Sequence, residues 1–277
     1  MKVTLLMTLL IFPLLLMATE TREQYMKVKI KWDNNITTLK SLLKNPMIGD
    51  ERWNYQKNLE EDYISHITAI DIDNHKKILD ISTSSYMKEN LIFQFKLTDV
   101  NKSKNIKYIF TDNRGHEKVY FINTNKRRSR SFASKKTTLS SKENSINYRQ
   151  RKSKVFESKE INEAIKELYP DMGKPIKEKI KLSKLDTSFC EENIPIHISS
   201  DIDLESLAVF NNQNKHPAIA IFTIRENSII DFKFSAQMFK TCTDYSIIVV
   251  GKDRSGNFYR TSRKGRIACA DGCGGGG

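Results

Sequence analysis

The chain has 277 residues, of which 39% are hydrophobic, and its 46 Lys and Arg against 33 Asp and Glu give a formal net charge of +13. Only 11 Gly and 6 Pro occur, which excludes a fibrous or low-complexity protein. The only long apolar run lies at the N-terminus, so a membrane protein with several spans is excluded as well. Four cysteines in a chain of this length do not indicate a disulfide scaffold.

Residues 1–18 have the pattern of a secretory signal peptide. Lys2 is followed by an apolar run from Val3 to Met17, and Ala18 is small enough to precede a cleavage site. The run is too short to span a bilayer comfortably, although an uncleaved N-terminal anchor is an alternative. We therefore expect export, with no stable membrane insertion, to a compartment where disulfides form.

Residues 19–124 are expected to form a first β-sandwich. Short runs of β-branched and aromatic residues alternate with polar ones, and turn signals such as Asp73-Asn74 separate them. The runs predict strands over 26–32, 64–72, 91–97, 106–110 and 118–122.

Residues 125–157 are expected to be a basic flexible linker. The segment 126–154 contains eleven basic residues and one acidic residue, Glu143, and so holds a net +10 of the total +13. Many of its other residues are Ser or Thr and no strong hydrophobic period is present, so the segment lacks the apolar surface to offset its ordering entropy. The alternative is an electrostatic patch for an anionic partner or a membrane surface.

Residues 158–268 are expected to form a second sandwich that begins with a short helix. Ser158 could cap a helix holding Ile161, Ile165 and Leu168, which Pro170 and Gly173 would end. Strands are predicted over 194–198, 204–210, 218–224, 229–234, 245–250 and 257–261. The predicted fold class is therefore all-β, with two Ig-like β-sandwich domains joined by the basic linker.

Residues 269–277 form a glycine-rich arm around Cys273. Gly272, Gly274 and Gly275 remove side-chain bulk next to its sulfur. Such an arm suits a thiolate that is carried into the narrow active site of another protein. Alternatives are an inert tail, or metal delivery through Cys269 and Cys273.

Cys190 and Cys242 lie just outside predicted strands of the second half and could form a structural disulfide. Four cysteines allow three complete pairings, among which the sequence does not choose. The five histidines show no zinc-like spacing and no Cys-x-x-Cys pair exists, so we expect no metal and no cofactor bound by the chain itself.

The two halves resemble the two subunits of the Sox thiosulfate-oxidation carrier, SoxYZ, fused in the order Z then Y. The resemblance implies an intramolecular contact between the Y-like and Z-like domains. The Z-like features are the Leu42-Leu43-Lys44-Asn45-Pro46-Met47 stretch and the turn at 110–115. The Y-like features are Glu163-Ala164-Ile165, the run at 192–198, Ala208-Val209-Phe210, the stretch 256–259 and the terminal Gly272-Cys273-Gly274-Gly275. Asp271 departs from the family, which usually has glycine there, and Asn45 replaces the family's His.

The resemblance implies a periplasmic carrier rather than an enzyme. A c-type cytochrome would join thiosulfate to Cys273, a dimanganese hydrolase would release sulfate, and a sulfane dehydrogenase would clear the remaining sulfur. The covalent sulfur intermediates on Cys273 would take the place of a cofactor. The alternative function is an exported two-domain binding module whose basic linker holds an anionic partner and whose tail is inert; we expect no nucleic-acid binding by a carrier.

Overall fold

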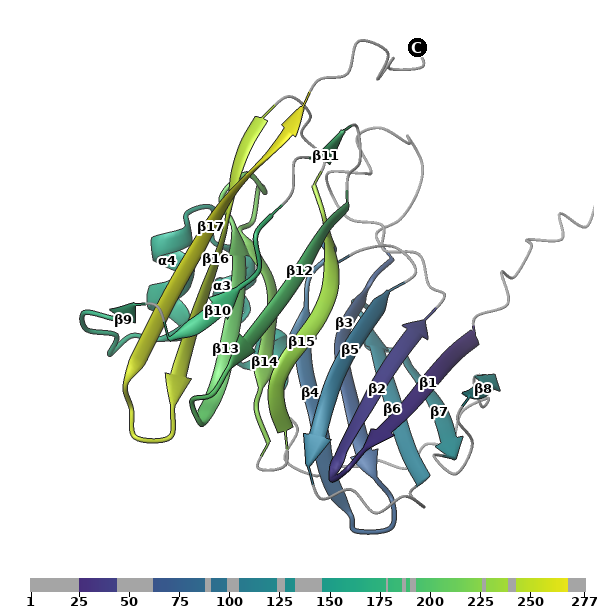
Figure 1. The fold of residues 1–277 in the computed structure, drawn as a ribbon. Coiled ribbons are helices and arrows are strands. Elements are labelled where there is room, and N and C mark those ends of the chain that lie inside the picture. Colours follow the sequence, from purple (N-terminus) through teal and green to yellow (C-terminus); the bar gives the residue numbers. More distant parts are fainter. Residues whose placement is uncertain are drawn as a thin grey trace, which may run out of the picture.

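The computed structural model describes residues 25–43, 62–87, 91–98, 105–123, 128–132, 146–177, 179–185, 188–189, 193–225, 228–238 and 243–268. These residues form two β-sheets packed face to face, with short helices on one side (Figure 1). The predicted all-β sandwich class is therefore confirmed. Among the described residues no helix is long and apolar enough to cross a membrane. The predicted signal peptide, the stretch at 44–47 and the arm lie outside the described residues.

The smaller sheet contains strands from both halves of the chain. Its order is β10 (Ile180–Leu182), β12 (Asn193–Ser200), β15 (Ser228–Gln237), β5 (Ile92–Thr98), β2 (Ile36–Leu43), β1 (Tyr25–Asp33) and β8 (Arg128–Phe132). All of the pairs in this sheet are antiparallel.

The larger sheet is also built from both halves. Its order is β11 (Ser188–Phe189), β17 (Phe258–Ala268), β16 (Thr243–Asp253), β13 (Leu204–Asn211), β14 (Ala218–Thr223), β4 (Lys76–Thr83), β3 (Ile64–Asp71), β6 (Asn105–Asp112) and β7 (Glu117–Asn123). A further short strand, β9 (Ile176–Lys177), pairs with β17 in parallel.

The two halves are joined edge to edge in both sheets. β5 of the first half pairs with β15 of the second, and β4 pairs with β14. One hydrophobic core therefore runs through the sandwich and contains side chains from each half, such as Phe95 and Phe222. The sequence predicted two sandwiches but not this pairing, because a strand's partner depends on residues that are far apart in the chain.

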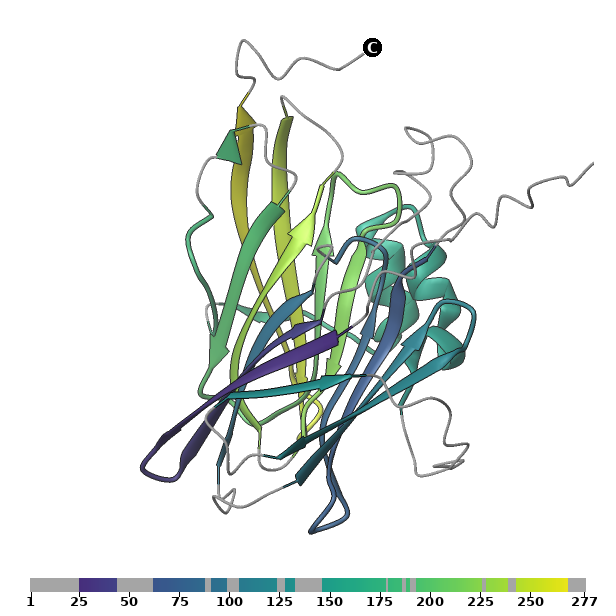
Figure 2. The ribbon, with the colours of Figure 1, turned by 90° about the vertical axis from the view of Figure 1, so that its right-hand side faces the viewer.

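Three short helices cover the outer side of the larger sheet (Figure 2). They are α2 (Tyr148–Arg151), α3 (Ser153–Glu157) and α4 (Ile161–Leu168). Val155 of α3 and Leu168 of α4 are buried against Phe210 of β13 and Val250 of β16. β13 is consequently buried on both faces, which explains its nearly continuous apolar sequence.

The structure differs from the expected linker and from the expected helix cap. Residues 128–132 form β8, an edge strand of the smaller sheet. The helices α2 and α3 lie within residues 148–157, where Val155 and Phe156 supply apolar side chains that are buried against the larger sheet. Ser158 does not begin α4. Its hydroxyl donates to the Lys154 carbonyl at 2.7 Å, and it occupies the end of α3, whereas Glu160 precedes α4 without a side-chain cap.

Candidate functional site

The cysteines and glycines singled out from the sequence lie outside the described residues, but the residues next to three of them converge. Phe189 precedes Cys190, Thr243 follows Cys242 and Ala268 precedes Cys269. Phe189 is the partner of Ala268 in the parallel pair of β11 with β17, and Thr243 is opposite Ile267 in the antiparallel pair of β16 with β17. Three cysteine-bearing segments thus depart from one end of the larger sheet, where the arm also begins (Figure 1).

The strand order bears on the disulfide predicted between Cys190 and Cys242. β17 lies between β11 and β16, so Phe189 and Thr243 are two strand spacings apart, roughly 10 Å. A disulfide requires Cα atoms within about 7 Å of each other. Ala268, by contrast, is one spacing from β11 and one from β16. Cys269 therefore follows β17, the strand that is adjacent to both β11 and β16.

A cavity lies beside this end of the sheet, and we call it the arm-root pocket. Its volume is about 590 Å³, and it is lined by Leu185, Asn212, Gln213, Asp244, Tyr245, Ser246, Lys264, Gly265 and Arg266. The Arg266 Nε atom is 3.8 Å from an Asp244 carboxylate oxygen, whereas Lys264 has no ion-pair partner among the described residues. The described residues that line the pocket therefore carry a net positive charge at the end of β17.

The backbone around the arm-root pocket is held in place by polar contacts and by a close approach. The Asn212 side chain accepts a hydrogen bond from the Ser246 N–H at 2.6 Å, which links the loop after β13 to β16. Tyr245 and Gly265 are direct partners in the β16–β17 ladder. A Cβ atom on Gly265 would lie within 3 Å of three atoms of the Tyr245 side chain, so only glycine leaves room for this buried ring.

The arm-root pocket was not predicted from the sequence. The last strand was predicted over 257–261, whereas β17 continues to Ala268 and brings Lys264, Gly265 and Arg266 into the sheet. An isolated glycine inside a strand often marks a position where another group approaches the backbone closely, so Gly265 is the residue that could have indicated the continuation of this strand.

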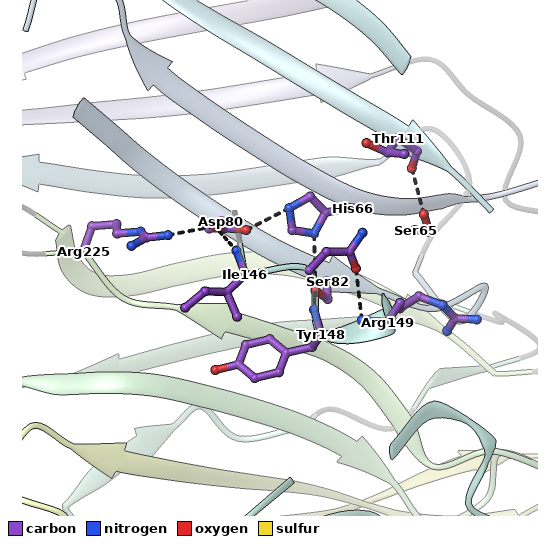
Figure 3. A network of polar contacts seen from close by, with 10 residues as sticks. Ser65, His66, Asp80, Ser82, Thr111, Ile146, Tyr148, Arg149 and Arg225 are labelled. Atoms are coloured by element: carbon purple, nitrogen blue, oxygen red, sulfur yellow. Dashed lines mark hydrogen bonds and ion pairs between the residues drawn. The ribbon is translucent and has the colours of Figure 1, made fainter. Parts of the chain in front are cut away.

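A buried polar network joins the two halves elsewhere in the larger sheet (Figure 3). His66 Nε2 lies 2.8 Å from an Asp80 carboxylate oxygen, and its Nδ1 lies 3.3 Å from the Ser82 hydroxyl. Arg225, which follows β14, donates to the other Asp80 oxygen at 2.8 Å. The Tyr148 N–H donates to the Ser82 hydroxyl at 2.9 Å.

This network contains a Ser-His-Asp set, but its surroundings do not suit catalysis. His66, Asp80 and Ser82 are each less than 5% exposed, so a substrate has no access to the hydroxyl. The Ser82 hydroxyl is also held by the Tyr148 N–H, on the segment that leads into α2. The network therefore serves to fasten β3 and β4 to the second half and to the residues before α2.

A second polar contact between the halves lies on the smaller sheet. Lys96 of β5 and His197 of β12 lie 2.5 Å and 2.9 Å from the two carboxylate oxygens of Asp231 on β15. Burial alone would raise the pKa of Asp231, but the hydrogen bond and charge of Lys96, with a smaller contribution from His197, hold this pKa below its usual value.

Within the described part of the chain, no three His, Cys, Asp or Glu side chains are grouped so that they could hold a metal ion. The candidate site is accordingly a positively charged pocket at the point where a cysteine-bearing arm leaves the sheet.

Comparisons with known proteins give no family assignment. No family model matches the chain, and no curated protein matches its sequence. Among solved structures, the sulfur carrier protein SoxY from Chlorobium limicola f thiosulfatophilum matches with 17% identity and a TM-score of 0.35, over 39% of this chain and 96% of SoxY. A segment of two fibronectin type-III domains from chicken tenascin matches over 87% of this chain and 98% of its own length, with 11% identity and a TM-score of 0.22. The chicken interferon gamma receptor alpha chain matches over 86% of this chain and 96% of its own, with 10% identity and a TM-score of 0.21.

Proposed function

We propose that this chain is a covalent carrier that holds a sulfur-containing group on the thiol of Cys273 and presents it to separate enzymes. The observation that carries the proposal is the sequence Gly272-Cys273-Gly274-Gly275, which begins four residues after the end of β17. A thiolate flanked by glycines at the end of a narrow strand can enter an active site that would exclude a folded domain.

The length of chain after β17 supports this role. Cys273 lies five positions after Ala268, so the sulfur could stand up to about 18 Å from the end of the strand. The positive arm-root pocket would also offset the charge of Asp271 and favour the thiolate at a neighbouring cysteine.

The cargo and partners that we propose follow the SoxYZ resemblance. Joining a Cys273 thiolate to thiosulfate would form an S–S bond and release an electron pair, which a c-type cytochrome would accept. A dimanganese hydrolase would then add water and release sulfate, and a sulfane dehydrogenase would oxidise the sulfur that remains on Cys273. These steps would take place in the periplasm, after removal of residues 1–18.

Mass spectrometry of the exported protein tests the proposal. The protein would be purified from thiosulfate-fed cells without reductant, together with Cys273→Ser and with Cys269→Ser as the matched control. We expect a reductant-sensitive adduct of sulfur or thiosulfate on the C-terminal peptide of the wild type and of Cys269→Ser, and none on Cys273→Ser. A Cys273 that is always unmodified, or always bonded to Cys269, would contradict the carrier function.

If the chain is instead a binding module, its function should not depend on Cys273. Its activity would survive Cys273→Ser and would fall with added salt, because screening weakens contacts between the basic segment and an anionic partner.

A further inference from the structure

A second cavity, which we call the edge pocket, lies along β17 where β9 pairs with it. Its volume is about 460 Å³, and its lining consists of Pro175, Lys177, Arg260, Thr261, Ser262 and Arg263. Among the described residues, the lining thus provides three cationic side chains, two hydroxyls and no carboxylate. This composition differs from that of the arm-root pocket, where Asp244 lies beside Arg266.

The edge pocket holds like charges side by side. Lys177 and Arg260 are direct partners in the parallel pair of β9 with β17. Like charges directly opposite each other destabilise a pair of strands. Arg263, three residues further along β17, is a third basic residue of the lining. A bound anion would remove this repulsion.

In the part of the chain that the structure describes, no acidic side chain neutralises these three charges. Among the described residues, neither Lys177, Arg260 nor Arg263 has an ion-pair partner, and the Arg263 guanidinium donates only to the Ser262 carbonyl at 3.1 Å. Two other lysines of this half do form ion pairs: Lys252 lies 2.8 Å from Glu205, and Lys181 lies 3.2 Å from Asp201. The edge pocket thus gathers three basic residues that have no ion-pair partner among the described residues.

The side chains that line the edge pocket indicate which class of ligand it would bind. Guanidinium groups bind oxyanions with paired N–H donors, and an ammonium and hydroxyls supply further donors. Thr261 is only 9% exposed, and its backbone is fixed by pairing with Val249. Pro175 is the one apolar residue among those that the structure describes in the lining, so these residues do not favour a hydrophobic ligand. We propose that the edge pocket binds a tetrahedral oxyanion of the sulfate, thiosulfate or phosphate type.

Two sources of such an anion are compatible with the chain, a free ion or an oxyanion carried on Cys273. Arg263 lies five residues before Ala268, about 17 Å along the strand. Cys273 lies five residues beyond Ala268, so the arm could return its sulfur to Arg263 only when almost fully extended. This geometry favours the free ion. The proposal uses neither Cys273 nor its neighbours and stands without the carrier function.

Calorimetric titration of the full-length protein tests the proposal. Sodium sulfate, thiosulfate and phosphate would each be titrated at constant ionic strength in chloride buffer, with the Cys273→Ser protein run in parallel. We expect saturable binding of all three ions, and a loss of affinity of about tenfold or more in Arg260→Gln and in Arg263→Gln. Lys181→Gln is the matched control, because it removes the same charge from a residue outside the pocket, and we expect its affinity to change less than twofold.

The outcomes separate the possibilities. Unchanged binding in Cys273→Ser identifies a free ion as the ligand, whereas binding that requires a sulfonate on Cys273 identifies the arm as the source. The proposal is overturned by an absence of saturable binding in the wild type, by binding of long polyanions alone, or by equal losses in Lys181→Gln and Arg260→Gln. Thermal unfolding in sulfate against chloride provides a second readout: the melting temperature should rise in the wild type and in Lys181→Gln but not in Arg260→Gln.

Discussion

Asp80 of β4 and Arg225, which follows β14, form a buried ion pair between the two halves of the chain, with 2.8 Å between the carboxylate and the guanidinium. Asp80 is 1% exposed and lies among side chains of both halves. His66 Nε2 is also 2.8 Å from Asp80, and the Ile146 N–H donates to it at 3.3 Å. A single carboxylate thus contacts β3, the second half and the segment before α2.

Arg225→Met should destabilise the protein strongly, because it leaves the Asp80 carboxylate buried without its cationic partner. Removal of one member of a buried pair costs about 3–5 kcal/mol, and since Arg225 is partly exposed we expect about 3 kcal/mol. Urea unfolding followed by circular dichroism measures this change. Arg254→Met is the control, because Arg254 pairs with an exposed carboxylate on Asp203 and should cost less than about 1 kcal/mol. Equal losses in the two variants would contradict a special role for Asp80.

The contact between Lys96 and Asp231 predicts a dependence of stability on pH. The pKa of Asp231 is lowered in the folded protein, so the unfolded state binds more protons below about pH 4, near the ordinary pKa of 3.9. The stability that this carboxylate contributes is complete above that range and is lost as the pH falls through the folded pKa. The free energy of unfolding of Asp231→Asn should therefore fall below that of the wild type at pH 7 and approach it under acid conditions.

Asp201→Asn is the comparison for this acid dependence. Asp201 also pairs with a lysine, Lys181, but its side chain is 92% exposed. We expect its substitution to leave the pH profile of the unfolding free energy close to that of the wild type. A constant difference between wild type and Asp231→Asn from pH 7 to pH 3 would show that the lowered pKa does not contribute.

The strand at 76–83 illustrates what the sequence could not predict. β4 carries Asp80 at its centre, and a charged residue within an apolar run interrupts the alternation that identifies a strand. The carboxylate is tolerated because His66 and Arg225 meet it, and these residues lie 14 and 145 positions away in the chain. Strands whose polar residues face outward, such as β5 and β12, were predicted nearly to their ends.

The candidate site was only partly predictable for a similar reason. The arm and its cysteine are evident from local composition, since glycine-rich tails need no partner to be identified. Both pockets depend on β17 extending beyond Thr261, to Arg263 for the edge pocket and to Arg266 for the arm-root pocket. The strand extends because β16 pairs with it along ten residues. The run from Arg263 to Arg266 has no hydrophobic pattern that would indicate this ladder.

Gly265→Ala should destabilise the protein, because the new methyl group would collide with the Tyr245 ring. Overpacking of a buried site costs about 1–3 kcal/mol. Gly173→Ala is the control: nothing lies within 4 Å of the position that its Cβ would take, and we expect a change below about 0.5 kcal/mol. In a Tyr245→Leu background, which shortens the opposing side chain, the cost of Gly265→Ala should shrink. An undiminished cost in that background would exclude the proposed collision as the cause.

The order of β11, β17 and β16 makes a specific prediction about the cysteines. Phe189 and Thr243 are separated by β17, whereas Ala268 is next to Phe189, so Cys269 is better placed than Cys242 to meet Cys190. Peptide mapping of oxidised, unreduced Cys273→Ser protein should find Cys269 in a disulfide, with Cys190 as its main partner. The same mapping of a Cys269→Ser variant should then show the Cys190–Cys242 bond that the sequence suggested, because no nearer partner remains. If Cys190 and Cys242 are already paired completely while Cys269 is present, the ends of the two strands must leave the ladder before the cysteines, and Cys269 would be free to exchange with Cys273.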